Sequence, residues 1–365
     1  MTSPLFKPFT CRGLKLPNRI VMAPMTRSFS PDGIPTEEVA SYYERRAANH
    51  VGLIVTEGTT TDRPAASNDT KVPTFHGDKA LAGWKNVVEK VHGAGGKIAP
   101  QLWHIGMVRK PGTGHNPDAA TDSPSGITHT GKDVDAAPSD EEVADMVSSY
   151  ARSARHAAEL GFDAIEIHGA HGYLIDQFFW GVMNQREGKY GGGLTERATF
   201  AADVIRECRA AVGEDMPIIL RYSQWKQQDF AAKLAQTPEE LGAFLEVFVD
   251  AGVDIFHCSQ RRFWEAEFEG SDLNLAGWTK KLTGRPTISV GSVGLTGEFV
   301  ASFGGESSEV APLDKLIDRM ERDEFDLIAV GRAILQDPEW VSKVKDGRFK
   351  DLRPYDASSA LTTLF

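Results

Sequence analysis

Eight short runs of apolar, often β-branched residues, separated by amphipathic stretches, constrain the fold of this chain more than any other feature. The runs are Arg19–Met25, Leu53–Glu57, Lys97–Trp103, Ala164–His168, Ile218–Tyr222, Ile255–Cys258, Thr287–Val290 and Leu327–Val330. Such runs are typical of parallel strands that are buried on both faces. Eight alternations of strand and helix favour a (β/α)8 TIM barrel over an open doubly wound sheet. The 365 residues (1–365) suffice for one such barrel as a single α/β domain.

Capping residues predict where three of the intervening helices begin. Thr237 precedes Pro-Glu-Glu, which provides an N-cap, a proline at the first helical position and a glutamate at the third. Ser139 and Glu142 have the same cap-to-glutamate spacing. Thr36 precedes two glutamates and predicts a helix that runs toward Ala48.

A long irregular stretch, rich in Gly, Pro, Thr and Asp, runs from His104 to about Pro138 (residues 104–138). A connection of this length inside a compact domain is usually a functional loop or a lid. Because it follows the third expected strand, we expect it at the carboxyl ends of the barrel strands, over the active site.

Composition and charge exclude several classes of protein. The three cysteines, Cys11, Cys208 and Cys258, have no disulfide-framework or metal-finger spacing, which is typical of a reduced, intracellular protein. No stretch approaches the roughly 20 apolar residues of a membrane span, and the first residues lack the apolar core of a signal peptide. The net charge of -11 argues against nucleic-acid binding. We therefore expect a cytoplasmic enzyme or binding protein without a nucleic-acid or membrane partner.

Glycine-containing turns follow the last two expected strands. They are Gly291-Ser292 after the seventh strand and Gly331-Arg332 after the eighth. Exposed backbone N–H groups in such turns bind phosphate in many barrels, and Arg332 adds a cationic fork. The alternative is a pair of tight turns with a surface arginine. Two adjacent turns and an arginine favour the phosphate.

His168, His171 and Tyr173 follow one another at the end of the fourth expected strand. Two imidazole N–H groups could hold and polarise a carbonyl or nitro oxygen, and the phenol of Tyr173 could protonate a carbanion-like carbon. Two alternatives stay open: an incidental pair with one histidine in the core, or a zinc site completed by Glu166. The chain could accordingly be a polarise-and-protonate enzyme, a metal-dependent hydrolase or a barrel that only binds a ligand.

Two further polar residues lie on neighbouring strands of the expected barrel. Arg221 ends the fifth strand and could stabilise an anionic ligand, or form a salt bridge inside the barrel. Gln101, near the end of the third strand, offers both a donor and an acceptor to a polar ligand edge.

Seven motifs together resemble the Old Yellow Enzyme family of flavin oxidoreductases. They are PLFKPFTCRGLKLPNRIVMAPMTRS, GLIVTEGT, QLWHIG, EIHGAHGYLIDQFF, NQREGKYGG, ILRYS and IAVGRAILQDPEW, in the family's order from about Leu5 to Trp340. The resemblance implies a TIM barrel with non-covalent FMN, which NADH or NADPH reduces. Reduced FMN would pass hydride to the β-carbon of an electron-poor alkene such as an enone, with nitro compounds and nitrate esters as further candidates. Family members occur as monomers and homodimers.

The resemblance also implies a role for each matching position. The residues implied to contact FMN are Ala23, Pro24, Met25, Thr26, Gly58, Gln101, Arg221, Gly291, Ser292, Gly331 and Arg332, the last four at its phosphate. His168 and His171 would bind the substrate oxygen, and Tyr173 would protonate the α-carbon. Trp103 would form a wall of the substrate pocket, and no metal ligand is implied.

Several positions depart from the family pattern. Thr26 places the chain nearer to the threonine-type branch than to the branch with cysteine, yet His171 stands where many threonine-type members have asparagine. Other departures are Trp180–Met183, Gly188, Ser223–Trp225 and an apparent insertion at Phe303–Ala311. Aromatic candidates for the mouth of the barrel are Trp180, Trp225, Phe263 and Trp264. These departures leave the flavin site intact and the substrate class open.

Overall fold

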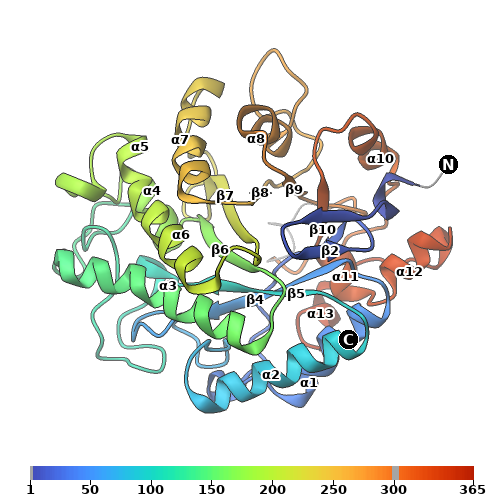
Figure 1. Cartoon of the computed structure of the whole chain (residues 1–365), viewed down its shortest axis with the longest axis horizontal. Coiled ribbons are helices and arrows are strands. Elements are labelled where there is room, and N and C mark those ends of the chain that lie inside the picture. Colours follow the sequence, from blue (N-terminus) through green and yellow to red (C-terminus); the bar gives the residue numbers. More distant parts are fainter. Residues whose placement is uncertain (1–2, 298–303) are drawn as a thin grey trace.

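The computed structural model describes residues 3–297 and 304–365, and its centre is a closed barrel of eight parallel strands (Figure 1). Around the barrel the order is β10-β3-β4-β5-β6-β7-β8-β9. The strands are β3 (Ile20–Met22), β4 (Leu53–Thr60), β5 (Ile98–Trp103), β6 (Ile165–His171), β7 (Ile218–Lys226), β8 (Ile255–Ser259), β9 (Thr287–Val290) and β10 (Leu327–Val330). Each of the eight predicted runs forms one of these strands, and the TIM barrel is confirmed.

Helices surround the central strands (Figure 1). The longer ones are α1 (Glu37–Ala48), α2 (Asp78–Gly93), α3 (Asp140–Leu160), α6 (Thr199–Val212), α7 (Pro238–Ala251), α8 (Leu275–Thr283) and α10 (Asp314–Glu321). The shorter α-helices are α4 (Leu174–Phe179), α5 (Leu194–Arg197), α11 (Arg332–Gln336), α12 (Trp340–Lys345) and α13 (Ala357–Ala360). Single 3-10 turns are η1 (Pro4–Phe6), η2 (Pro31–Gly33), η3 (Gly106–Val108), η4 (Gly188–Tyr190) and η5 (Phe349–Asp351). Within the described residues, no helix has the length and apolarity needed to cross a bilayer.

The three predicted helix starts are confirmed by their caps. The hydroxyl of Thr36 accepts from the N–H of Val39, and that of Thr237 accepts from the N–H of Glu240. Ser139 forms a complete capping box, in which its hydroxyl accepts from the N–H of Glu142 and the Glu142 carboxylate accepts from the N–H of Ser139. Each cap pairs an N–H group that the helix itself leaves unpaired.

Alternation along the strands divides the apolar core into two parts. One part lies between the strands and the helices, and the other fills the inside of the barrel. An antiparallel hairpin of β1 (Phe9–Cys11) and β2 (Leu14–Leu16), which the sequence analysis did not predict, joins the inner part. Phe9, Leu14 and Leu16 pack there with the first inward residues of the barrel strands, so the hairpin closes the amino-terminal end.

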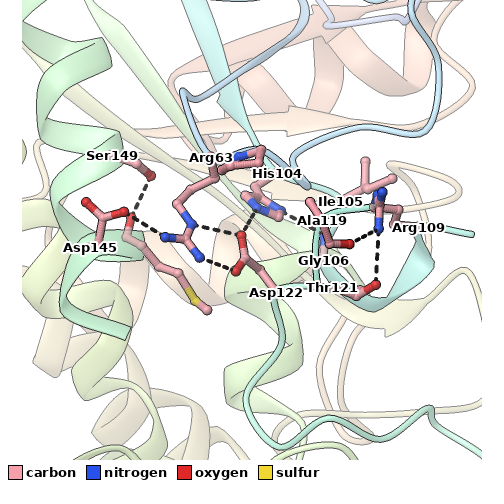
Figure 2. A network of polar contacts seen from close by, with 12 residues as sticks. Arg63, His104, Ile105, Gly106, Arg109, Ala119, Thr121, Asp122, Asp145 and Ser149 are labelled. Carbon is pink, nitrogen blue, oxygen red and sulfur yellow. Dashed lines mark hydrogen bonds and ion pairs between the residues drawn. The ribbon is translucent and has the colours of Figure 1, made fainter. Parts of the chain in front are cut away.

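Residues 104–138 connect β5 to α3 and are tied down by polar contacts (Figure 2). The Asp122 carboxylate accepts from the Arg63 guanidinium at 2.5 and 2.9 Å, and lies 2.8 Å from Nε2 of His104. Arg109, which is 3% exposed, donates to the carbonyl oxygen of Ala119 at 2.9 Å. These buried contacts give the segment one folded-back conformation without a helix or strand longer than η3 among its residues.

Candidate active site

A cavity of about 380 Å³ opens at the carboxyl ends of the barrel strands. This volume is within the range of about 300–1,000 Å³ that is usual for ligand and cofactor sites. The residues predicted from the sequence that line it are Ala23, Pro24, Met25, Thr26, Gln101, Trp103, His168, His171, Tyr173, Arg221, Gly291, Ser292, Gly331 and Arg332. Thus predicted residues from six barrel strands or the turns after them meet at one place.

Gly58 is the exception among the predicted site residues. It does not belong to the described lining of the cavity, because the indole of Trp103 covers it. A Cβ atom at Gly58 would lie 2.7 Å from a carbon of that ring, so the glycine allows Trp103 to pack closely. Trp103 is thus the neighbour of Gly58 in this structure, and the contact of Gly58 with a ligand stays a prediction.

Of the four aromatic candidates for the mouth of the barrel, one lines the cavity and three do not. Trp225 lines the cavity and packs against His171, with 4.7 Å between ring centroids. Trp180 stacks on His129 instead, and Phe263 and Trp264 pack edge to face against each other. Among the described residues, these three aromatic side chains and the segment 104–138 contribute nothing to the cavity wall.

The sequence analysis missed several lining residues. Ser259 at the end of β8 and Gln227 just after β7 were overlooked because both strands continue beyond the predicted runs. Tyr355 and Leu361 arrive from the last segment of the chain. Tyr355 is held by a pair of backbone hydrogen bonds to Ser308. Ser308 belongs to the expected insertion, of which Phe303 lies outside the described residues.

His168, His171 and Tyr173 converge because the chain turns sharply after β6. His171 and Gly172 have φ angles of 66° and 76°, the left-handed conformation that non-glycine residues rarely adopt. This turn brings the ring of Tyr173 to 5.1 Å from that of His168, and the two imidazoles are also 5.1 Å apart, centroid to centroid. The three side chains therefore face one part of the cavity, although a strained residue lies among them.

A buried ion pair holds this turn in place. Nζ of Lys226 donates to Asp176 at 2.6 Å, and both side chains are 0% exposed. The same carboxylate accepts from the N–H of Gly172 at 2.7 Å. Asp176 lies in the first turn of α4 and Lys226 ends β7, so the pair connects the two segments that carry Tyr173 and Gln227.

Both histidines are neutral. Burial, reinforced by the nearby Arg221 cation, lowers the pKa of His168 and that of His171 well below the usual value. Nδ1 of His168 accepts from the N–H of Ala170 at 3.3 Å, so its single proton is on Nε2. Nε2 of His171 lies 2.7 Å from the hydroxyl oxygen of Ser259, and the same oxygen accepts a hydrogen bond from Arg221.

Tyr173 keeps its proton as well. Burial raises the pKa of Tyr173 above its usual value, so the phenol is protonated at neutral pH. Its oxygen lies 3.2 Å from Nε2 and 3.4 Å from Oε1 of the exposed Gln227. The cavity thus contains a neutral N–H donor at His168 and a neutral O–H donor at Tyr173, side by side.

Glu166 is paired with two other side chains. Its carboxylate contacts Nε2 of Gln101 at 2.8 Å and Nδ1 of His257 at 2.6 Å, below the cavity. Among the described residues, no group of three or more His, Cys, Asp or Glu side chains is arranged to hold a metal ion. The described part of the chain therefore offers no third ligand for the zinc alternative at His168 and His171.

The turns after β9 and β10 lie side by side, since these strands are neighbours in the barrel. Gly291 has φ 136°, and a Cβ atom there would lie 2.7 Å from the carbonyl oxygen of Gln260. Only glycine therefore fits at this position of the turn. Arg332 donates to the hydroxyl of Ser292 at 3.3 Å and to the carbonyl oxygen of Gly297 at 2.6 Å. Its guanidinium is thereby fixed beside both turns.

The sequence profile of the NADH:flavin oxidoreductase / NADH oxidase family matches residues 4–303. The chain belongs to this family. The resemblance to the Old Yellow Enzyme family is thus confirmed at the level of the family, and the protein is an NAD(P)H-dependent flavin oxidoreductase with FMN as its cofactor.

Curated relatives and a solved structure agree with this membership. NADH oxidase of Thermoanaerobacter brockii is 33% identical over 358 residues, which are 96% of this chain and 52% of that protein, so the chain spans about half its length. The 12-oxophytodienoate reductase 7 of Oryza sativa subsp. japonica is 30% identical over 367 residues, 94% of this chain and 88% of the relative. Morphinone reductase in complex with tetrahydroNAD superposes with a TM-score of 0.78 at 25% identity, over 94% of this chain and 90% of the other.

The cavity of this family member fits FMN in two respects. Nε of Arg221 is buried and has no hydrogen-bond partner among the described residues, which leaves a cationic donor for a polar ring. At the other end, the bare turn at Gly291 and the fixed guanidinium of Arg332 suit an anionic group. A molecule with a polar ring edge and a phosphate matches both ends.

Proposed function

We propose that the protein is an ene-reductase, which reduces activated C=C bonds of electron-poor alkenes such as enones. NADH or NADPH would reduce the bound FMN, and the reduced flavin supplies the hydride. The observation that carries this proposal is the convergence of two neutral histidines and a protonated phenol in one cavity. None of the three is a strong nucleophile, whereas all three suit hydrogen bonding and proton donation.

In this mechanism, the histidines hold the oxygen that activates the alkene. When hydride reaches the β-carbon, negative charge moves onto that oxygen, and hydrogen bonds to it strengthen. The N–H at Nε2 of His168 is available for this role because Nδ1 already accepts from backbone. His171 would supply the second donor by exchanging its contact with Ser259 for the substrate oxygen.

Tyr173 would then protonate the α-carbon. Its raised pKa keeps the proton on the phenol until a carbanion-like carbon is present. Trp103, whose ring lies 5.0 Å from that of Tyr173, would form the wall that keeps the alkene beside the phenol.

The proposed FMN contacts follow the lining of the cavity. Ala23, Pro24, Met25 and Thr26 would lie along the ring, and Gln101 and Arg221 at its pyrimidine edge. Gly291, Ser292, Gly331 and Arg332 would hold the phosphate. With Thr26 and the pair His168 and His171, we assign the chain to the threonine-type branch with a His/His substrate pair.

Four further features belong to the proposal. Residues 104–138 would act as an active-site loop or lid, and polar contacts such as those of Asp122 and Arg109 hold this segment in place. The protein would act in the cytoplasm, consistent with three unpaired cysteines. It would be a monomer or a homodimer, with nitro compounds or nitrate esters as additional substrates.

The test is a steady-state screen of enones, nitroalkenes and nitrate esters with both nicotinamides, using protein purified with its flavin. We expect turnover of at least one alkene class and release of free FMN on denaturation. A colourless protein that contains stoichiometric zinc would overturn the proposal, and so would a flavoprotein that oxidises NAD(P)H with quinones but reduces no activated alkene.

A further inference from the structure

A polar layer lies inside the barrel, directly below the cavity. Neighbouring strands each contribute one inward side chain to it: Gln101 of β5, Glu166 of β6, Arg221 of β7 and His257 of β8. The register places Gln101 opposite Glu166 and Arg221 opposite His257, while between β6 and β7 it places Arg221 opposite His168 and Ile219 opposite Glu166. Glu166 and His257 are 0% exposed, whereas Gln101 and Arg221 also line the cavity. The layer therefore connects the inside of the barrel to the site.

Glu166 is the centre of this layer. Oε1 accepts from the side-chain N–H of Gln101 at 2.8 Å, and Oε2 lies 2.6 Å from Nδ1 of His257. Burial alone would raise the pKa of Glu166, but His257 and Arg221 together lower it below its usual value. The carboxylate is therefore ionised, and an ionised carboxylate only accepts hydrogen bonds.

This one-sided chemistry fixes the amide of Gln101. A glutamine amide can usually turn over, because its oxygen and nitrogen have nearly the same shape. Here the amide nitrogen of Gln101 must face Glu166, so the amide oxygen points away from Glu166. Gln101 also lines the cavity. A ligand in the cavity thus meets a fixed acceptor beside the cation of Arg221. That pattern is complementary to an imide edge, in which an N–H lies between two carbonyl oxygens.

Stability alone does not account for the layer. Two residues earlier on the same strands, the inward side chains are apolar: Ala99, Ala164, Ile219 and Ile255. Burying a carboxylate, an amide and an imidazole is unfavourable unless all are well paired. Nε2 of His257 is buried and has no hydrogen-bond partner among the described residues, so the layer is not arranged for stability alone.

We propose that Glu166 is a positioning residue for the flavin ring. It holds Gln101 as the acceptor for the imide N–H, and it offsets the charge of Arg221, which limits how strongly the site favours the anionic, reduced ring. This inference rests on the proposed function, because it uses the proposed placement of the pyrimidine edge at Gln101 and Arg221.

The test is Glu166→Gln, which keeps the size of the side chain, removes the charge and lets the amide either donate to or accept from Gln101. Oxidised FMN should bind about tenfold more weakly, the loss of one hydrogen bond. Reduced FMN should lose little affinity, because the Arg221 charge is no longer offset. A tenfold change in this affinity ratio corresponds to a midpoint potential about 30 mV more positive for a two-electron couple. Riboflavin should weaken by the same factor as FMN, because the change is at the ring.

Two controls separate positioning from a merely structural role. Glu166→Asp keeps an acceptor-only carboxylate and should restore the potential toward that of the wild type. His257→Gln keeps the charge of Glu166 and offers it an amide donor, so the potential should change little. A folded Glu166→Gln protein with an unchanged or more negative potential would overturn the inference.

A measurement on the unaltered holoprotein covers the case in which Glu166→Gln does not fold. With FMN labelled with nitrogen-15 at N3, the imide proton should be hydrogen-bonded and slow to exchange, and a fast-exchanging proton would contradict the inference. The two proposals also fail separately. If the protein binds FMN and reduces alkenes while Glu166→Gln leaves the potential unchanged, only the role of Glu166 is wrong. If no flavin binds, the proposed function is wrong, and the inference with it.

Discussion

At the amino-terminal end of the barrel the inward side chains are apolar and the β1–β2 hairpin covers them, whereas at the carboxyl end the same strands present polar side chains to a cavity. The transition can be followed along β6 and the residue that precedes it. Its successive inward positions are Ala164 in the apolar core, Glu166 in the buried polar layer and His168 at the cavity. Four residues along one strand thus separate packing from chemistry.

The contrast between the two ends allows one barrel to be stable and reactive at once. Apolar layers and the hairpin stabilise the amino-terminal end of the barrel, called the lower end below. The carboxyl end, called the upper end, can therefore tolerate a left-handed His171, buried cations and unpaired polar atoms. We therefore expect substitutions at the upper end to change reactivity with little loss of stability, and substitutions at the lower end to do the reverse.

The largest expected effect is on reactivity at the upper end. Tyr173→Phe removes the proposed proton donor and should slow alkene reduction by about 10²–10⁴-fold. Oxidation of NAD(P)H with a quinone needs no protonation at carbon and should continue at the wild-type rate. The free energy of unfolding should stay within about 1 kcal/mol of the wild type, because the ring remains. An equal fall of both activities would show that Tyr173 is not the selective proton donor.

One ion pair at the carboxyl end of the barrel should contribute to stability as well as to reactivity. Lys226→Met leaves the Asp176 carboxylate buried without its cation, and the free energy of unfolding should fall by about 3–5 kcal/mol. Denaturant unfolding measures this loss. Because the carboxylate also accepts from Gly172, the turn that carries Tyr173 should loosen, and alkene reduction should fall with it.

The matched control is Lys226→Met combined with Asp176→Asn. The asparagine oxygen can still accept from Gly172, and no buried charge is left alone, so part of the lost stability should return. If Lys226→Met alone were as stable as the wild type, the ion pair would not hold the turn, and the simple division between the two ends would stand without exception.

Leu14→Ala at the lower end should lower the free energy of unfolding by about 2–5 kcal/mol. Leu14 is 1% exposed and packs with the apolar residues inside the barrel. FMN affinity and the rate of alkene reduction, measured well below the unfolding temperature, should stay at wild-type values. A change of flavin potential in this variant would show that the lower end also tunes the site.

The sequence predicted most of the barrel because parallel strands buried on both faces leave continuous apolar runs. It missed β1 and β2 because each has only three residues, too few for a periodic signal. The strand-end residues of the cavity, such as Gln101 and Arg221, could be predicted once the barrel was assumed. Ser259 and Gln227 could not, since the extension of β7 and β8 depends on pairing between strands that are distant in sequence.

Glu166 shows a further limit of prediction from sequence. Its alternation with His168 indicated correctly that both point inward, and it left a zinc site open. The separation of the two side chains into different layers, and the partner His257 on another strand, are consequences of barrel closure. Short-range spacing contains no information about either.

The smallest expected effect is an absence of pH dependence at the upper end. A histidine with an ordinary pKa near 6.5 would be roughly three-quarters protonated at pH 6. His168 and His171 have pKa values well below that, so both stay neutral between pH 6 and 8. The dissociation constant of a saturated cyclic ketone, which offers an oxygen but no reducible bond, should change by less than about twofold over this range.

Stability should respond to the same histidines in a definite direction. In the unfolded chain they bind protons below about pH 6.5, whereas in the folded protein they do not. Their contribution is therefore complete above that pH and is lost as the pH falls. His168→Asn keeps an N–H donor for the ketone and removes one titrating group. It should therefore lose less stability than the wild type between pH 7 and 5 and still bind the ketone.

If ketone binding in the wild type followed a titration near pH 6.5 that His168→Asn abolished, His168 would be charged in the site. The neutral-donor description of the upper end would then be wrong.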